Sequence, residues 1–441
     1  MEQSQYIRAN KGFSFLCAPR EFCAAVVLLW GINPASFLYN WAIYAGVVLL
    51  WACFAAASEW KRFWKTVFHP AMLLSLAWPV LLFVYALAGH VEFPFHHLLM
   101  PIFYLMFWFY FSLPDRFAMK LLTFVTTAYY LLINAGTVLA LRQNPDVSRL
   151  LANGDPTVTG PLASPFTGGF QHIYSLTMFT VAVVGILWYY RPRIFETVGW
   201  GIAVLLGLLT IVMSNYSFAI LFVFVFSLLV LCRLPKRGGP TTAILLICAL
   251  AAIVVLPNLY RIFYFIAENT DSLKMQLRFI EVGNLLSGTG ITEGSDAGTR
   301  IELYTASLKT FLSAPLFGVG DLILKTAEDP RSIVGGHSIV CDYLAYYGLV
   351  GSVLFHSILI GNFCRIEKLL DRRGRFLYLV VFVLYYVQIT VNAGYNEPLI
   401  EVLYLLVPNL LILTGERTAR QREQAAPPQP SRYIRQRPAQ W

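Results

Sequence analysis

Charge is what this sequence has least of. Only 13% of its 441 residues are Asp, Glu, Lys or Arg, whereas soluble domains carry about 25%. The seven cysteines form no CxxC pair and no loop framework, which excludes the usual zinc and disulfide patterns. The chain has no glycine-rich phosphate loop and no nucleic-acid module. These absences argue against a soluble protein that binds nucleotides or nucleic acid.

Long apolar runs take the place of charge. Hydrophobic residues make up 57% of the chain, and runs of about 18 to 22 such residues recur from end to end, each long enough to cross a bilayer. This pattern predicts an all-α polytopic integral membrane protein with about 12 transmembrane helices. The predicted spans are 22–38, 40–57, 70–88, 95–113, 118–140, 170–190, 196–213, 216–232, 241–257, 338–361, 376–394 and 397–414.

The distribution of Lys and Arg orients these spans. No cleavable signal is found, so the first span is expected to stay as an anchor. With the N-terminus in the cytoplasm, 24 of the 33 basic residues fall on the cytoplasmic side, as the positive-inside rule requires. The other nine lie in two long loops, which are therefore predicted to lie outside. The formal charge of +9 thus reflects topology rather than a nucleic-acid partner.

Spans and loops divide the chain into four parts. Residues 1–257 hold the first nine spans, with an outer loop near 141–169. Residues 258–337 form a large outer loop that carries the candidate site, and 338–415 hold the last three spans. The stretch 416–441, whose end is rich in Pro, Gln and Arg, is predicted to be a disordered cytoplasmic tail.

The large loop is predicted to be partly helical. Apolar residues recur at roughly helical spacing over 260–280, which favours one or two amphipathic helices on the membrane surface. Another helix is predicted to begin at Thr299, because Thr299 and Glu302 have the spacing of a capping box. Pro315 ends that helix, and a Gly-Val-Gly turn follows at 318–320.

Two side chains of this loop are candidates for chemistry. Arg300 falls in the first turn of the predicted helix, where the helix dipole disfavours a cation by about 0.3 to 1 kcal/mol. It is either a solvated or salt-bridged charge, or it faces an anion held at that N-terminus. His337 immediately precedes a span, where the same dipole favours a neutral imidazole that is available as a base. The alternative for His337 is a polar residue satisfied at the membrane interface.

These motifs follow one another in a distinctive order. The chain reads Gly298-Thr-Arg300, a helix, Ala314-Pro-Leu-Phe-Gly-Val-Gly320, a short polar insert, and then His337-Ser-Ile-Val-Cys-Asp-Tyr-Leu-Ala-Tyr-Tyr-Gly348-Leu-Val-Gly351. This order resembles the signature of the bacterial O-antigen ligase and polymerase superfamily. In that family a periplasmic loop carries an arginine, a "Pro…Gly-x-Gly" turn and a "His-Asn/Ser…Leu…Gly-Leu-x-Gly" segment.

The chain departs from the family pattern at one turn. Many members have a Ser-Arg-Gly-like turn at the outer end of a middle span, whereas the corresponding turn here, 214–217, reads Ser-Asn-Tyr-Ser. A second phosphate-binding arginine must then come from elsewhere. Arg261 is the first choice, followed by Arg142 and Arg278.

The resemblance implies a membrane glycosyltransferase of the O-antigen ligase type, with a GT-C-like fold, in the bacterial inner membrane. The donor would be a glycan on undecaprenyl diphosphate, and the acceptor a sugar hydroxyl of lipid A-core at the periplasmic face. His337 would be the general base, with Arg300 and a second arginine on the diphosphate. Direct displacement would invert the anomeric centre. The donor carries the energy, so no cofactor is expected, and the loops hold no DxD pair for a metal.

Other polar side chains near the spans have competing interpretations. Asp342 lies about 140° around the helix from His337 and is interpreted as a packing partner within the bundle, paired with a tyrosine. Glu397 and Glu401 are either acceptor-sugar ligands or solvated or paired carboxylates. Two further interpretations concern histidines: His172 is expected to be structural, and Glu92, His96 and His97 match no zinc spacing.

The sequence leaves three other functions open. A polymerase of the same superfamily would use two carrier-linked glycans, and the motif does not separate it from a ligase. A protein O-oligosaccharyltransferase comes next. A secondary transporter is disfavoured, because no internal repeat is evident and the ionisable residues cluster near the outer ends of the spans.

Overall fold

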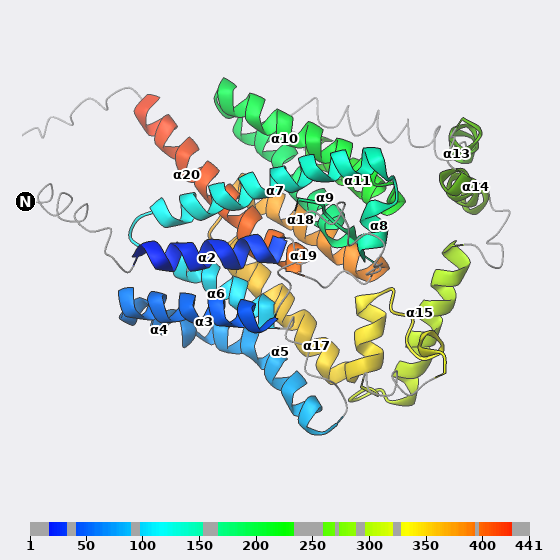
Figure 1. Ribbon diagram of the computed structural model, residues 1–441, viewed down its shortest axis with the longest axis horizontal. Helices are drawn as coiled ribbons and strands as arrows, with labels where there is room; N and C mark the ends of the chain where they lie inside the picture. The colour runs from blue at the N-terminus through cyan, green and yellow to red at the C-terminus, as the bar shows by residue number, and fades with distance from the viewer. Residues whose placement is uncertain are drawn as a thin grey trace, which may run out of the picture.

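A computed structural model describes residues 17–32, 41–89, 98–152, 166–232, 259–269, 273–287, 296–320, 328–392 and 397–425. All regular secondary structure in these ranges is helical, and no strand occurs in them (Figure 1). The described chain is therefore an all-α polytopic membrane protein, as the apolar runs predict.

The first half of the chain forms ten helices within the described residues. They are α2 (Cys17–Ile32), α3 (Trp41–Ser58), α4 (Trp60–Val67), α5 (Pro70–Leu87), α6 (Leu99–Ser112), α7 (Phe117–Gln143), α8 (Val147–Ala152), α9 (Phe170–Tyr190), α10 (Ile194–Met213) and α11 (Ser217–Cys232).

The second half contains the surface helices of the large loop and the last spans. They are α13 (Leu259–Glu268), α14 (Leu273–Ser287), α15 (Asp296–Ser313), the 3₁₀ turn Pro330–Ser332, α17 (Ile339–Glu367), α18 (Arg372–Val391), α19 (Glu397–Glu401), the π-helix Val402–Leu406 and α20 (Val407–Ala425).

Seven helices of the described chain are long and apolar enough to cross a membrane, and three shorter apolar ones accompany them. The seven are Pro70–Leu87, Phe117–Gln143, Phe170–Tyr190, Ile194–Met213, Ile339–Glu367, Arg372–Val391 and Pro398–Gln421. Each of these corresponds to a predicted span. The predicted ninth span, 241–257, lies outside the described residues.

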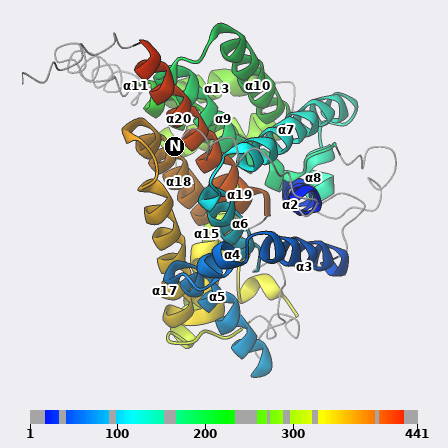
Figure 2. The same ribbon diagram turned by 90° about the vertical axis from the view of Figure 1, so that its left-hand side faces the viewer.

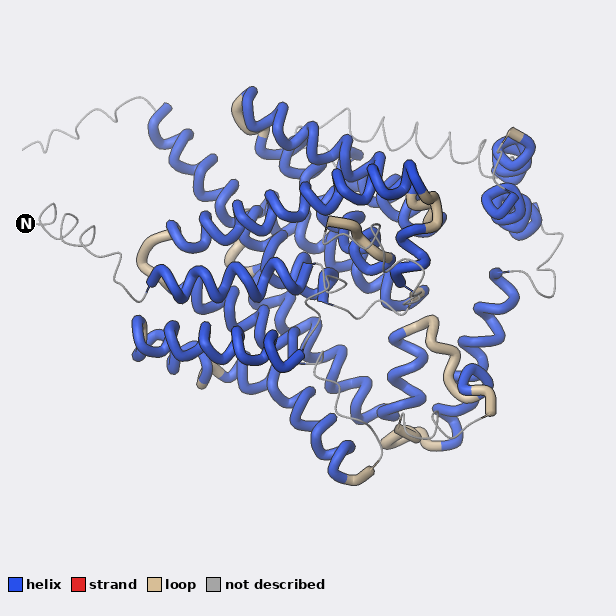
Figure 3. The backbone as a smooth tube through the Cα atoms, viewed as in Figure 1, coloured by secondary structure: helices blue, strands red, loops and turns tan. Residues whose placement is uncertain are grey.

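The helix α9 and the continuous α19–α20 helix form the centre of the bundle. Both are buried along most of their length, whereas α10 exposes most of its apolar surface. Figure 1 shows α4 at one end of the long axis and α15 at the other, and we call these the α4 end and the α15 end. Figure 2, viewed from the α4 end, shows α4 beside α5 and α6, and Figure 3 shows the described loops and turns in tan.

Side-chain caps explain where several helices begin. The Ser338 hydroxyl accepts from the Cys341 amide at the start of α17, and Asp371 accepts from the Gly374 amide at the start of α18. Such caps satisfy amide groups that have no partner within the helix. The start predicted for the loop helix is wrong: α15 begins at Asp296, three residues before Thr299, in agreement with the preference for acidic residues in a first turn.

The C-terminal boundary also differs from the predicted one. The last helix, α20, continues to Ala425, ten residues beyond the predicted end of the spans at 415. This helix contacts the first turn of α10 through an ion pair between Arg417 and Glu196. The remainder of the predicted tail, 426–441, lies outside the described residues.

Candidate functional site

The helix α17 is broken in its first half. Gly348 has φ 61° and ψ −166°, so the helix stops and restarts there. In an unbroken helix the amides of Leu349 and Val350 would bond to the carbonyls of Ala345 and Tyr346, four residues before them. The break separates all four groups, and each must find another partner inside an apolar bundle.

The turn after α15 supplies those partners. The amides of Leu349 and Val350 donate to the carbonyls of Pro315 and Leu316, at 2.8 and 3.1 Å. In return, the amides of Val319 and Gly320 donate to the carbonyls of Ala345 and Tyr346, both at 2.9 Å. The Pro…Gly-x-Gly turn therefore fills the gap in α17.

Glycines make this close approach possible. A Cβ at Gly318 would fall on the backbone of Tyr346, and one at Gly348 would fall on the backbone of Leu316. Both glycines also have positive φ, which L side chains rarely adopt. The Tyr85 hydroxyl of α5 donates to the carbonyl of Phe317 at 2.7 Å and holds the turn from the other side. The two glycine motifs that carry the family resemblance are thus one interlocked structure.

His337 lies two residues before Ile339, the first residue of this broken helix. It precedes Ser338, the N-cap of α17, and is only partly exposed. Its Nδ1 is buried and has no hydrogen-bond partner among the described residues. The backbone on its N-terminal side is tightly placed, because a Cβ at Gly335 would fall on the backbone of Leu303 in α15.

Asp342 holds the His337 turn against α15. Its Oδ1 accepts from the Ser307 hydroxyl at 2.7 Å, and its Oδ2 accepts from the Ser338 amide at 3.1 Å. Ser307 in turn accepts from the Gly335 amide at 3.0 Å. The interpretation that Asp342 pairs with a tyrosine is wrong, because the loop brings a serine of α15 to it. A buried carboxyl needs such bonds to offset its desolvation.

The polar side chains of α15 that contact neighbouring segments lie along one side of the helix, here called the stripe. Arg300, Tyr304, Ser307 and Thr310 follow at helical spacing, and Thr310 donates to the carbonyl of Ile333. Tyr304 donates to the carbonyl of Val391 at 3.0 Å, and its burial raises the pKa of its hydroxyl. Since seven residues of helix rise about 10 Å, Arg300 lies roughly that distance along the axis from Ser307.

Arg300 occupies the end of the stripe next to α18. Its Nη1 donates to the carbonyl of Val391 at 2.9 Å and to Oδ1 of Asn392 at 3.2 Å. Its guanidinium also lies over the ring of Phe218, 5.0 Å from the centroid. Phe218 directly follows the Ser-Asn-Tyr-Ser turn, so α15 brings Arg300 to the very turn where many family members carry an arginine. Because α15 begins early, Arg300 lies one turn inside the helix and not in its first turn.

The structure does not bring the other candidate arginines to this stripe through described contacts. Arg261 is exposed on α13, where its Nε donates to the Tyr260 hydroxyl at 3.0 Å. In Figure 1, α13 and α14 pack on each other and lie apart from the bundle. Arg142 is exposed in the last turn of α7, with no described bond to Arg300 or His337. Arg278 belongs to α14, and its side chain lies outside the described residues.

Glu401 is neither a solvated carboxylate nor one that is paired with another described residue. It is fully buried at the end of α19, and neither carboxyl oxygen has a hydrogen-bond partner among the described residues. A Cβ at Gly31 of α2 would fall on this carboxyl group, and a π-helix follows it. Glu401 is buried because α19 enters the centre of the bundle rather than its rim. The side chain of Glu397 is not among those described.

The remaining histidines have different outcomes. His172 is buried in α9, and its Nε2 shares a 2.8 Å hydrogen bond with Oδ1 of Asn134 in α7, which agrees with a structural role. The group of Glu92, His96 and His97 lies outside the described residues.

Sequence reasoning missed the residues that position the site. Ser307 gave no signal of its own, since one serine on an amphipathic helix is unremarkable. The Ser338-to-Asp342 spacing carries a usable signal, because a cap serine followed four residues later by a carboxylate is related to a capping box. No residue type reveals that the carbonyl of Val391 accepts from Arg300.

The fold and the site define a polytopic all-α membrane protein with a helical loop docked into a broken span. Residues 202–356 match the family model described as O-antigen ligase. The matched segment includes Arg300, the interlocked turn and His337, and the match supports membership of the O-antigen ligase/polymerase superfamily. No curated protein matches the chain.

Proposed function

We propose that the protein is an inner-membrane glycosyltransferase that transfers O-antigen glycan from undecaprenyl diphosphate to a sugar hydroxyl of lipid A-core at the periplasmic face. One observation carries the proposal. Asp342 and Ser307 hold the His337 turn against α15, the helix that presents Arg300, within the family-matched segment.

The proposed reaction is a direct displacement. The acceptor oxygen attacks the anomeric carbon of the donor, and His337 takes the hydroxyl proton. The bond between that carbon and the diphosphate oxygen breaks, and undecaprenyl diphosphate leaves with the electron pair. Arg300 offsets the charge that develops on the leaving diphosphate. The step inverts the anomeric centre and uses no metal.

Two features support His337 as the base. Its Nδ1 has no hydrogen-bond partner among the described residues, so no described side chain competes for a proton there. Its backbone is held by the Gly335 contact with α15 and by the Ser338 cap, which limits where the ring lies. A base must stand at a defined place relative to the attacking hydroxyl.

The test is reconstitution of the full-length protein with a carrier-linked glycan. One sample receives lipid A-core as acceptor, and a matched sample receives only a second carrier-linked glycan. Transfer to lipid A-core that a chelator does not reduce is the expected result. Growth of the carrier-linked glycan without transfer to lipid A-core would identify a polymerase. Movement of the glycan across the bilayer with the carrier bond intact would contradict the proposal that the protein is an enzyme.

A further inference from the structure

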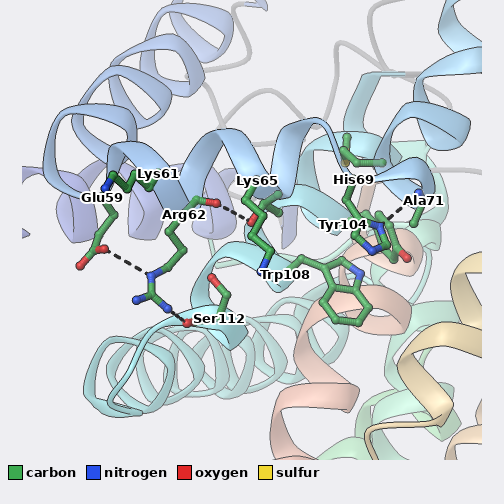
Figure 4. A pocket seen from close by; sticks show the side chains of 11 residues that line it. Glu59, Lys61, Arg62, Lys65, His69, Ala71, Tyr104, Trp108 and Ser112 are labelled. Atoms are coloured by element: carbon green, nitrogen blue, oxygen red, sulfur yellow. Dashed lines mark hydrogen bonds and ion pairs between the residues drawn. The ribbon is translucent and has the colours of Figure 1, made fainter.

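A pocket at the α4 end gathers basic side chains that the proposed reaction does not use. Its volume is about 630 Å³, within the range of about 300 to 1,000 Å³ that is usual for small-molecule sites. It is bounded by α4, by the start of α5 and by α6. Figure 4 shows its lining side chains, with His69 and Trp108 toward the α5 and α6 side.

Charge in the pocket is predominantly positive. Lys61, Arg62 and Lys65 line it, against the single carboxylate of Glu59. Arg62 bonds to Glu59 at 3.3 Å and to the carbonyl of Ser112, so that carboxylate is already engaged. Neither lysine forms an ion pair within the described residues, and both are exposed. Two cations therefore remain for an anionic occupant.

A further cation lies behind the pocket wall. Arg365 of α17 stands close to Tyr104, which lines the pocket. Its Nη1 is buried, with no hydrogen-bond partner among the described residues. Arg365 interacts electrostatically with Tyr104, so it adds positive charge close to the pocket.

The residues around the pocket are typical of a membrane surface. The helix α4 is short and buries Phe63, whereas Trp60 at its start is 62% exposed and Phe68, directly after it, is 63% exposed. Aromatic rings beside basic side chains are typical of the lipid headgroup level. The distribution of Lys and Arg predicts that this end faces the cytoplasm, where anionic headgroups attract basic segments.

We infer that the pocket formed by α4, α5 and α6 binds the phosphodiester headgroup of an anionic phospholipid from the surrounding bilayer. Lys61 and Lys65 contact the phosphate oxygens, and Arg62 borders them from its position beside Glu59. The apolar wall of Met72 and Trp108 lies where the first part of an acyl chain leaves the headgroup. This site is separate from the α15 end and does not depend on the proposed reaction.

The test uses full-length protein in nanodiscs of phosphatidylcholine with a minor fraction of phosphatidylglycerol. Native mass spectrometry counts the phosphatidylglycerol molecules that the released protein retains. The expected result is preferential retention, which the double variant Lys61→Gln and Lys65→Gln weakens by about ten-fold or more, since each cation near a lipid surface contributes to binding. The matched control is Lys368→Gln with Arg372→Gln, which removes two exposed charges at the same end, outside the pocket.

Several results would overturn the inference. Equal retention of phosphatidylglycerol and phosphatidylcholine by the unaltered protein would remove the preference for an anionic lipid. An equal loss in the pocket and control variants would reduce it to general surface charge. Displacement of the retained lipid by millimolar inorganic phosphate would assign the site to a free anion. Thermal unfolding provides a second measurement, because phosphatidylglycerol should raise the Tm of the unaltered protein and not that of the pocket variant.

Discussion

The two ends of the bundle are stabilised in different ways. At the α15 end, four backbone hydrogen bonds join the 315–320 turn to the break in α17, and Asp342, only 3% exposed, joins three segments. At the α4 end of the described chain, two ion pairs between partly exposed side chains join different helices, Arg116–Glu416 and Arg417–Glu196, whereas Arg62–Glu59 and the buried Arg20–Glu21 pair are local to one helix. Buried hydrogen bonds, which water cannot replace, stabilise the α15 end. Substitutions there should therefore have much larger effects than substitutions at the α4 end.

The largest effect is expected at His337. Replacing it by Ala should lower the rate of glycan transfer by about 10² to 10⁴, because a positioned base contributes that much. Initial rates in the reconstituted assay measure the change. The matched control is His356→Ala in the same helix, where the ring bonds to Tyr386 away from the loop. Transfer by His337→Ala at more than a tenth of the normal rate would remove His337 from the base role.

Arg300→Lys should follow closely. Lysine keeps the charge but loses the planar fork, so we expect transfer to fall by about 10²-fold. Arg331→Lys, on the exposed 3₁₀ turn of the same loop, controls for the exchange itself. Normal rates in Arg300→Lys would show that Arg300 only ties α15 to the end of α18.

The break in α17 should respond next, through stability. Gly348→Ala places a Cβ on the backbone of Leu316 at φ 61° and ψ −166°, a conformation essentially restricted to glycine, where backbone strain alone costs about 1 to 3 kcal/mol. Thermal unfolding in detergent should show a clear fall in Tm. Gly361→Ala, in the same helix, meets only the end of Arg365 at 3.8 Å and should leave the Tm unchanged or raise it. An unchanged Tm in Gly348→Ala would contradict the interlock.

A smaller effect is expected at Ser307. Removing its hydroxyl takes one partner each from Asp342 and from the Gly335 amide, which costs about 1 to 3 kcal/mol. We expect kcat to fall by about ten-fold, with KM nearly unchanged and partial recovery in Ser307→Thr. The control is Ser313→Ala, an exposed serine of the same helix. A change in KM alone would point to a binding role instead.

The smallest effect is expected at the α4 end. Arg417→Gln breaks the ion pair with Glu196, whose side chains are 43% and 33% exposed. Such pairs contribute about 0 to 1 kcal/mol, and salt screens them. The Tm should shift by no more than a few degrees, and less at 1 M salt. A loss as large as that of Gly348→Ala would erase the distinction between the two ends.

The sequence predicted the helices well and their junctions poorly. Spans such as α9 and α10 follow from unbroken apolar runs, because only helices satisfy backbone groups within lipid. Pro315, Gly318 and Gly348 are recognisable in the sequence as residues that end helices or form turns. The hydrogen bonds that join the two segments are not predictable, because bonds between backbone groups do not depend on residue type.

The candidate site was predictable only in part. Arg300 and His337 came from motif order, whereas Arg261 was chosen by its place in the loop and lies on a separate helix pair. Burial of Glu401 also depends on where a helix enters the bundle, which hydropathy along one chain does not encode. Pairwise contact across 35 residues, as between Ser307 and Asp342, requires the folded loop.

The broken helix also has a consequence for how the protein is made. Until the 315–320 turn docks, the amides of Leu349 and Val350 have no acceptor, and lipid offers none. We therefore expect a fixed order of folding, in which the 315–320 turn docks before the two parts of α17 form a complete span. A chain cut between 320 and 328 should assemble only when both pieces are synthesised together, which co-expression of the two fragments would reveal.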